Sequence, residues 1–368
     1  MRIVVKLGTK VLTRGIGELD IGRIASLCAQ LTALRLAGHE VLVVSSGAVG
    51  LGMGRLGWTS RPRRLAQQQL CAAVGQSVLT ETWQQGFEPH GLRVAQVLLT
   101  REDVTARRRH IAVRDLLEAA LAAGIVPIIN ENDTISADEL KFGDNDVLSA
   151  LVASLAKAQL LVILSTAEGL IDPATGQLVT HVERITDAHR AMAGGPGDAT
   201  STGGMITKLQ AAELACQSGC GVTITNGAQP DVIRRLLIDG EAVPGTHFAP
   251  QTPDLSARRR YLAFFEPPGG TVRVDAGAAA AVLEGTNSLL AKGCTAVEGT
   301  FAAGVTISVC DPQGREIARG RSAYGSADLA AALGLRSSDL ETRFPEMTRW
   351  EVIHRDDLVV LAEDAGAA

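Results

Sequence analysis

Short apolar runs alternate with stretches of helical periodicity over residues 1 to about 245 of this chain. The apolar runs are nearly continuous, which is typical of strands that are buried on both faces. The predicted strands are "IVVKLG", "VLVVSSG", "RVAQVLLT", "VPIINEN", "LLVILS" and "GVTITNG". The stretches between them predict helices at 21–34, 107–123, 145–157 and 204–218, the first of them capped by Asp20. This order predicts an α/β fold, in which a mostly parallel sheet lies between layers of helices.

The pattern changes near residue 249. The segment "APQTPDLSA" has two prolines and little periodicity, so it is typical of a linker. Beyond it, short strand-like segments separated by glycine-containing turns predict a small β-rich domain with a helix or two. We therefore predict a first domain at 1–248, a linker at 249–257 and a second domain at 258–362.

Composition adds limits to this picture. Hydrophobic residues make up 46% of the chain and charged residues 20%, as in ordinary globular proteins. The net charge of −5 gives no general argument for nucleic-acid binding. The longest apolar stretch, 147–165, contains Lys157 and Gln159, so it predicts a helix followed by a strand rather than a membrane span.

The six cysteines are scattered, and only Cys216 and Cys220 lie close together. No Cys-x-x-Cys pair or histidine cluster completes a metal site, so we expect most of the thiols to be small buried hydrophobes. Scattered thiols fit a reducing compartment, and the first residues read as a strand rather than a signal peptide. We therefore expect a cytoplasmic protein.

Polar residues and glycines collect where the predicted strands end. Open α/β sheets bind ligands at the carboxyl ends of their strands, and repetition at one edge favours a site over a set of ordinary turns. These strand ends are "KLGTK", "SSGAVGLG", "NEND", "LSTAEG" and "TNGAQ".

The first two strand ends each allow two interpretations. Lys6 lies inside a strand. It either extends its ammonium group to water or provides a fixed positive charge beside phosphates. In the second case, Gly8 would let the phosphates approach the backbone N–H groups. Ser46 is either the N-cap of a following helix, or Gly47 forms a tight turn that aims that helix's N-terminus at an anion.

Two further segments are equally open when taken alone. "TGGMITK", residues 202–208, has paired glycines and a lysine but lacks the Walker A spacing, so an ordinary glycine-rich loop is the alternative to a phosphate site. "NEND" and "GDND" form either a solvated acidic loop or a pocket. A helix needs only one capping residue, whereas three polar residues, Asp144, Asn145 and Asp146, stand at the start of this one. Capping alone therefore does not explain them.

No Ser-His-Asp or Cys-His set is apparent, and none of the seven histidines lies in these strand-end motifs. Two lysines, glycine-rich turns and acids that could hold Mg²⁺ are the parts that phosphoryl transfer requires.

These motifs, taken in order, resemble the amino acid kinase family. The resemblance rests on "VVKLGTKVL", "VSSGAVGLG", "AAVGQ", "VPIINENDTI", "KFGDNDVLSALVA" and "TGGMITKLQAA". "NENDTI" and "GDND" point to the branch of that family that phosphorylates glutamate. The C-terminal part, with "VDAGAAAAVLEG" and "GREIARGRSAYGS", resembles a PUA domain.

The resemblance implies that ATP and L-glutamate give γ-glutamyl phosphate and ADP with the help of Mg²⁺, as the first step of proline synthesis. It implies that Asp133 faces the substrate's ammonium group and that Asn145 and Ser46 help orient its carboxylates, with Asn130 and Asp144 nearby. For the phosphates it implies Lys6 and Lys208, with Asp146 organising the lysines or the metal. The implied nucleotide positions are Lys6, Gly8, Ser165, Thr166, Thr202, Gly203, Gly204, Met205, Ile206, Thr207 and Lys208.

Two adjacent residues depart from the family. Many members have Thr-Asp where this chain has Ser165 and Thr166. Ser165 keeps a hydroxyl group, but Thr166 cannot supply the carboxylate, so we expect a change in nucleotide affinity or base preference.

Two other functions compete with glutamate phosphorylation. One is a kinase for N-acetylglutamate, aspartate or a nucleoside monophosphate, which would share the lysines and glycines. The other is RNA binding through the second domain, for which "RRRY" at 258–261 is the nearest basic run. The resemblance also implies a dimer or tetramer and feedback inhibition by proline.

Overall fold

The structure is a computed structural model that describes residues 1–136, 145–194, 204–251, 262–343 and 350–361. The chain forms two compact units, Met1–Asp254 and Leu255–Ala368, and each is described by itself. The limits predicted for the linker, 249–257, are not tested by these units, because residues 252–257 lie outside the described ranges.

The first unit is built on an eight-stranded sheet, counted over the described residues, in the order β5-β6-β4-β1-β7-β9-β10-β8. The strands from β5 to β9 in this order run parallel, and β10 is antiparallel to β9. The mostly parallel sheet is thus confirmed. The strands are β1 (Arg2–Leu7), β4 (Glu40–Ser45), β5 (Val94–Leu99), β6 (Val126–Glu131), β7 (Leu160–Ser165), β8 (His181–Val182), β9 (Gly221–Asn226) and β10 (Gly245–Phe248), with a separate hairpin of β2 (Thr13–Gly15) and β3 (Glu18–Leu19).

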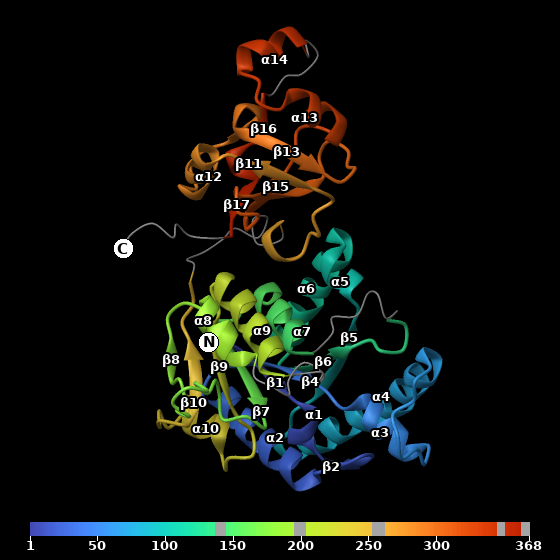
Figure 1. The fold of residues 1–368 in the computed structure, drawn as a ribbon. Helices are drawn as coiled ribbons and strands as arrows, with labels where there is room; N and C mark the ends of the chain where they lie inside the picture. Colours follow the sequence, from blue (N-terminus) through green and yellow to red (C-terminus); the bar gives the residue numbers. More distant parts are fainter. Residues whose placement is uncertain (137–144, 195–203, 252–261, 344–349, 362–368) are drawn as a thin grey trace. The chain divides into compact units, whose positions relative to one another are not determined.

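Helices cover both faces of this sheet (Figure 1). The four helices predicted from periodicity are present as α2, α6, α7 and α9, and the side chain of Asp20 caps α2 as expected. The helices are α1 (Thr9–Leu12), α2 (Ile21–Leu36), α3 (Ala48–Arg55), α4 (Leu65–Phe87), α5 (Arg101–Thr105), α6 (Arg107–Ala122), α7 (Asn145–Leu155), α8 (Asp187–Ala193), α9 (Met205–Gln217) and α10 (Val232–Leu237), with a 3₁₀ turn η1 (Glu88–His90).

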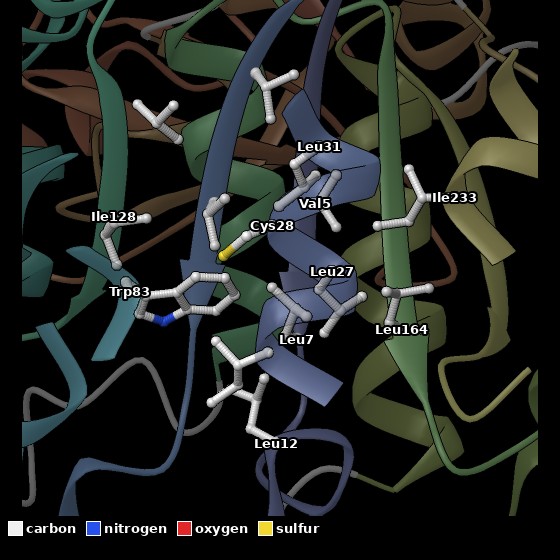
Figure 2. Close-up of a cluster of buried hydrophobic side chains, with 14 of the residues drawn as sticks. Val5, Leu7, Leu12, Leu27, Cys28, Leu31, Trp83, Ile128, Leu164 and Ile233 are labelled. Carbon is white, nitrogen blue, oxygen red and sulfur yellow. The ribbon is translucent and has the colours of Figure 1, made fainter. Parts of the chain in front are cut away.

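The core on one face of the sheet is formed by α2, α4 and α10. Figure 2 shows Leu27 and Leu31 of α2, Trp83 of α4 and Ile233 of α10 gathered against strand residues such as Val5. All five are fully or almost fully buried. Burial of each large apolar side chain stabilises the fold by about 1.5–3 kcal/mol. This layer therefore stabilises the sheet on which the site is built.

The opposite face carries α7, which is buried on nearly every side. It lies against β1, β4, β6, β7 and α9. Each residue from Leu148 to Leu155 is buried, which is the pattern of a helix enclosed by neighbours. The first turn of α7, with Asn145 and Asp146, is thereby held at the carboxyl edge of the central strands.

α3 and α4 lie in backbone contact through two glycines. A Cβ atom on Gly75 of α4 would lie 1.8 Å from the carbonyl oxygen of Ala48, and one on Gly52 of α3 would lie 1.8 Å from that of Cys71. Only glycine allows helices to approach this closely. Since α3 begins at the end of β4, α4 sets the position of that turn.

The second unit has a five-stranded sheet, β13-β11-β14-β15-β17, and a pair of short strands, β12 and β16, among the described residues. Its own core includes Val272, Ile307 and Tyr324, so the β-rich second unit is confirmed. The basic run at 258–261 lies outside the described residues. The elements are β11 (Thr271–Val274), α12 (Ala276–Leu283), β12 (Leu289–Leu290), η4 (Ala291–Gly293), β13 (Cys294–Glu298), β14 (Thr306–Cys310), β15 (Glu316–Arg321), α13 (Ser326–Ala332), α14 (Ser337–Arg343), β16 (Glu351–Ile353), η5 (Arg355–Asp357) and β17 (Leu358–Val360).

Five of the six cysteines are buried and Cys310 is half-buried, as expected of thiols that act as small hydrophobes. Burial raises the pKa of Cys28 and Cys294 to about 12, so these thiols stay protonated and unreactive at neutral pH. No helix in the described part of the chain is both long and apolar enough to span a bilayer.

Candidate active site

Lys6 is the fifth residue of β1, and the residue is only 3% exposed. It points to the side of the sheet that α7 covers, and its ammonium group forms an ion pair with the carboxylate of Asp146. A lysine that extended its charge to water would be exposed. The structure therefore excludes the first interpretation of Lys6, and its position beside phosphates remains a prediction.

Asp146 joins two lysines. It lies in the first turn of α7 with no exposed surface, and Lys208 Nζ lies 3.1 Å from its Oδ2 atom. Burial alone would raise the pKa of Asp146, but attraction to Lys6 and Lys208 outweighs it, so the pKa is lowered. The N-terminus of α7 favours the same charge. The carboxylate thus holds two ammonium groups at one edge of the sheet.

Lys208 is placed by the first turn of α9. Gly204 is the N-cap, and Thr207 donates a hydrogen bond from its hydroxyl group to the Gly204 carbonyl at 2.9 Å. Thr207 also lies 3.4 Å from Asp146 Oδ2. Met205 and Ile206 complete this turn, whereas Thr202 and Gly203 lie outside the described residues.

The turn after β4 resolves the choice at Ser46. Gly47, with φ of 114°, is the N-cap of α3, and no side chain caps this helix. The alternative in which Ser46 is the N-cap is therefore wrong. The Ser46 hydroxyl instead accepts a hydrogen bond from Asn145 Nδ2 at 2.8 Å.

The amides of Asn145 and Asn130 meet beside this turn. Asn145 Nδ2 donates to Asn130 Oδ1 at 2.8 Å, and Asn130 is only 3% exposed. Asp133 lies in the turn directly after β6 and is half-buried. Asp144 lies outside the described residues. Ser46, Asn130 and Asn145, which come from three separate motifs, thus form one polar cluster, and the place of Asp133 beside it remains a prediction.

The strand ends of β1 and β7 meet next to the lysines. The backbone N–H of Gly8 donates to the Leu164 carbonyl at 3.1 Å. Ser165 is the last residue of β7 and is mostly buried, while Thr166 is exposed. The predicted nucleotide positions therefore include two that line this edge, Gly8 and Ser165, and the role of Thr166 remains a prediction.

Sequence comparison agrees with this geometry. The signature of the amino acid kinase family matches residues 1–226, and that of the PUA domain matches residues 270–344. This chain belongs to the amino acid kinase family. Family membership implies the use of ATP as the phosphoryl donor.

This amino acid kinase has curated relatives along nearly its whole length. Glutamate 5-kinase from Pelobacter propionicus is 43% identical over 365 residues, which cover 98% of this chain and 97% of the relative. Glutamate 5-kinase from Myxococcus xanthus is 45% identical over 365 residues, which cover 98% and 96%. The crystal structure of UMP kinase from Ureaplasma parvum matches with a TM-score of 0.48 and 13% identity, over 68% of this chain and 99% of that one.

Three residues of the site in this amino acid kinase were not among the sequence candidates. Gln76 accepts a hydrogen bond from Asn130 at 2.9 Å, and Trp83 donates to the buried hydroxyl of Ser45 at 3.0 Å. The signal for Gln76 is a polar residue on a buried helical face, three residues before Leu79 and four after Ala72.

Acid should lower the folding stability of this amino acid kinase by protonating Asp146. Because its folded pKa lies below the ordinary value of 3.8, the ionised carboxylate stabilises the fold above that pH, and this contribution is lost as the pH falls through the folded pKa. The difference in unfolding free energy between the wild type and Asp146→Asn should be constant above about pH 5 and shrink below about pH 4. Urea unfolding from pH 3 to 7 would measure it, and a constant difference over that range would contradict the assignment.

Proposed function

We propose that this chain is a glutamate 5-kinase: it transfers the γ-phosphoryl group of ATP to the side-chain carboxylate of L-glutamate, giving L-glutamyl 5-phosphate and ADP. This is the first step of proline biosynthesis from glutamate. The observation that carries the proposal is a pair of buried lysines on one buried carboxylate, beside a cluster of uncharged polar side chains. The named relatives supply the identity of the amino acid.

The chemistry fits a carboxylate acceptor. A glutamate side chain has a pKa near ~4.3, so it reaches the site already ionised and no general base is required. The barrier is repulsion between this anion and the phosphates of ATP. Lys6 and Lys208 supply two positive charges where those anions would meet, and Asp146 keeps both ammonium groups in place before the substrates arrive.

The amino acid would bind at the cluster of Ser46, Asn130 and Asn145, with Asp133 at its edge. The amide groups and the serine hydroxyl offer uncharged hydrogen-bond partners, and Asp133 offers the charge that an ammonium group requires. The nucleotide would lie along Gly8 and Ser165 and over the first turn of α9, from Gly204 to Lys208.

Mg²⁺ belongs to this proposal as a companion of ATP. Within the described ranges, no three His, Cys, Asp or Glu side chains gather in an arrangement able to hold a metal ion. Both oxygens of Asp146 already face lysines, so its role as a metal ligand stays a prediction. Mg²⁺ is commonly held by substrate phosphates and water with few protein ligands, and it would neutralise phosphate charge here.

Gly8 provides a test of the nucleotide position. In the structure, a Cβ atom on Gly8 would lie 3.5 Å from the Leu164 carbonyl and 3.9 Å from Lys6 Nζ, which are ordinary contacts, and its φ is −71°. Gly8→Ala should therefore fold with unfolding free energy within about 1 kcal/mol of the wild type. It should raise the KM for ATP by about tenfold or more, because a methyl group would occupy the approach of the phosphates.

Steady-state kinetics with ATP varied at saturating glutamate would measure this effect, and the KM for glutamate is the internal control. A Gly8→Ala enzyme with an unchanged KM for ATP would place the phosphates elsewhere.

Glutamate-dependent release of ADP tests the function itself. A coupled assay should show ADP release with glutamate and little without it. Aspartate, N-acetylglutamate and UMP form the control panel, because relatives of these kinds would share the two lysines. Equal turnover without an added amino acid, or a preference for another member of the panel, would overturn the proposal.

Three properties implied by the family remain predictions. They are inhibition by proline, assembly into a dimer or tetramer, and RNA binding by PUA domains, which for this chain is the competing function that its net charge of −5 does not favour. The assay above with added proline addresses the first of them.

A further inference from the structure

A chain of buried amides leads from the polar cluster into α4. Asn145 Nδ2 donates to Asn130 Oδ1 at 2.8 Å, and Asn130 Nδ2 donates to Gln76 Oε1 at 2.9 Å. Asn130 and Gln76 are 3% and 6% exposed. Buried amide groups are costly to leave unpaired, so each of these side chains restrains the next.

Contacts with two backbone groups identify the oxygen end and the nitrogen end of these two amides. The N–H of Glu131 donates to Asn130 Oδ1 at 2.9 Å, and Asn145 Nδ2 donates to the Ser45 carbonyl at 3.3 Å. A backbone N–H can only donate and a carbonyl can only accept, so exchanging oxygen and nitrogen in either amide would break these bonds. Asn130 therefore presents its NH₂ group to α4, and the side-chain oxygen of Gln76 accepts the hydrogen bond.

The same orientation leaves one acceptor for a ligand. Asn145 Oδ1 is buried and has no hydrogen-bond partner among the described residues. A ligand group that meets this oxygen must be a donor, which an ammonium group is and a carboxylate is not. This differs from the expectation that Asn145 helps orient the carboxylates of glutamate.

We propose that Gln76 is a positioning residue for the amino acid substrate, and this inference rests on the proposed function. Gln76 acts through Asn130: its oxygen holds the Asn130 amide in the orientation that holds Asn145, whose free oxygen then receives the substrate's α-ammonium group. Without that oxygen, the NH₂ group of Asn130 would be buried without an acceptor, and a rotated Asn130 would release Asn145.

The far side of Gln76 completes its support. Gln76 Nε2 donates to Thr80 Oγ1 and to Gln96 Oε1, both at 3.2 Å. Thr80 lies one turn further along α4 and is half-buried, and Gln96 is an exposed residue of β5. Water can replace the contact to Gln96, whereas it has little access to the contact between Gln76 and Asn130.

The test compares three substitutions of similar size. Gln76→Met keeps the length of the side chain but removes the acceptor, and it should raise the KM for glutamate by about tenfold while the KM for ATP changes by less than about twofold. Gln76→Glu restores an oxygen that can accept from Asn130 and should return the KM for glutamate to within about threefold of the wild type. Gln96→Met is the matched control and should behave as the wild type.

A merely structural role would lower the melting temperature or raise both KM values together, and either result without a selective change for glutamate would overturn the proposal. An equal effect of Gln96→Met would also overturn it. If Gln76→Met does not fold, Gln76→Ala, which leaves room for water, is measured against the same outcomes.

Failure of the proposed function would be visible separately, as a wild type without glutamate-dependent ADP release. In that case a crystal structure of Gln76→Met gives the answer: a rotated Asn130 amide supports the positioning role, and an unchanged amide overturns it.

Discussion

Asp146→Asn is expected to lower kcat by about 10²–10³-fold and to destabilise the fold by about 3–5 kcal/mol. Asparagine fills the same space but carries no charge, so the buried ammonium groups of Lys6 and Lys208 would lose the carboxylate that both of them contact. Both lysines would then move apart or lose protons, and the charge needed to bring two anions together would be lost. Steady-state kinetics and urea unfolding measure the two effects.

Asp20→Asn is the matched control for this substitution. Asp20 also carries a lowered pKa, through a hydrogen bond from Arg14, but it caps α2 and accepts hydrogen bonds from Arg14 and from the backbone N–H of Arg23. Asparagine caps a helix about as well as aspartate. The unfolding free energy of Asp20→Asn should therefore stay within about 1 kcal/mol of the wild type, and its activity should be unchanged. Full activity in Asp146→Asn would count against the role assigned to Asp146.

Gly75→Ala should strongly destabilise the contact between α3 and α4. Its Cβ atom would lie 1.8 Å from the Ala48 carbonyl oxygen and 2.5 Å from the backbone nitrogen of Gly52, and backbone atoms cannot yield without moving a helix. We expect a loss of at least about 3 kcal/mol in unfolding free energy, the upper range of overpacking. Because Ala48 follows Ser46 and Gly47 directly, a displaced α3 would also move the Ser46 hydroxyl away from Asn145 and raise the KM for glutamate.

Gly50→Ala is the control within α3. A Cβ atom on Gly50 would meet no atom within 4 Å, so only helix propensity changes, and the fold should gain up to about 1 kcal/mol. Denaturant unfolding of both variants gives the comparison. Equal unfolding midpoints for Gly75→Ala and the wild type would contradict the close contact of α3 and α4.

The central sheet could be predicted from the sequence because its strands are buried on both faces. A run such as "LLVILS" leaves no polar alternation, and β7 occupies Leu160–Ser165, the residues of that run. The 23-residue helix α4 was not predicted. Its glutamines and small residues weaken the periodic signal, since its close contact with α3 uses glycines instead of large apolar side chains.

In the candidate site, too, some residues could be predicted from the sequence, whereas their contacts could not. Lys6 and Asp146 could be proposed from the sequence, because a lysine inside a strand and three polar residues at a helix start are unusual on their own. That Asp146 pairs with Lys6 and Lys208 at once depends on how β1, α7 and α9 come together, which no local pattern contains. Gln76 lies 54 residues from Asn130 along the chain, so only the fold reveals their hydrogen bond.

The central claim is that the side-chain carboxylate of glutamate attacks the phosphoryl group held by the two lysines. The direct measurement uses glutamate labelled with ¹⁸O in that carboxylate, with ATP and hydroxylamine present to cleave the acyl phosphate. Hydroxylamine attacks the carbonyl carbon, so the released phosphate should carry one labelled oxygen from the substrate, in step with ADP release. Release of ADP with unlabelled phosphate would show that water is the acceptor and would contradict the account.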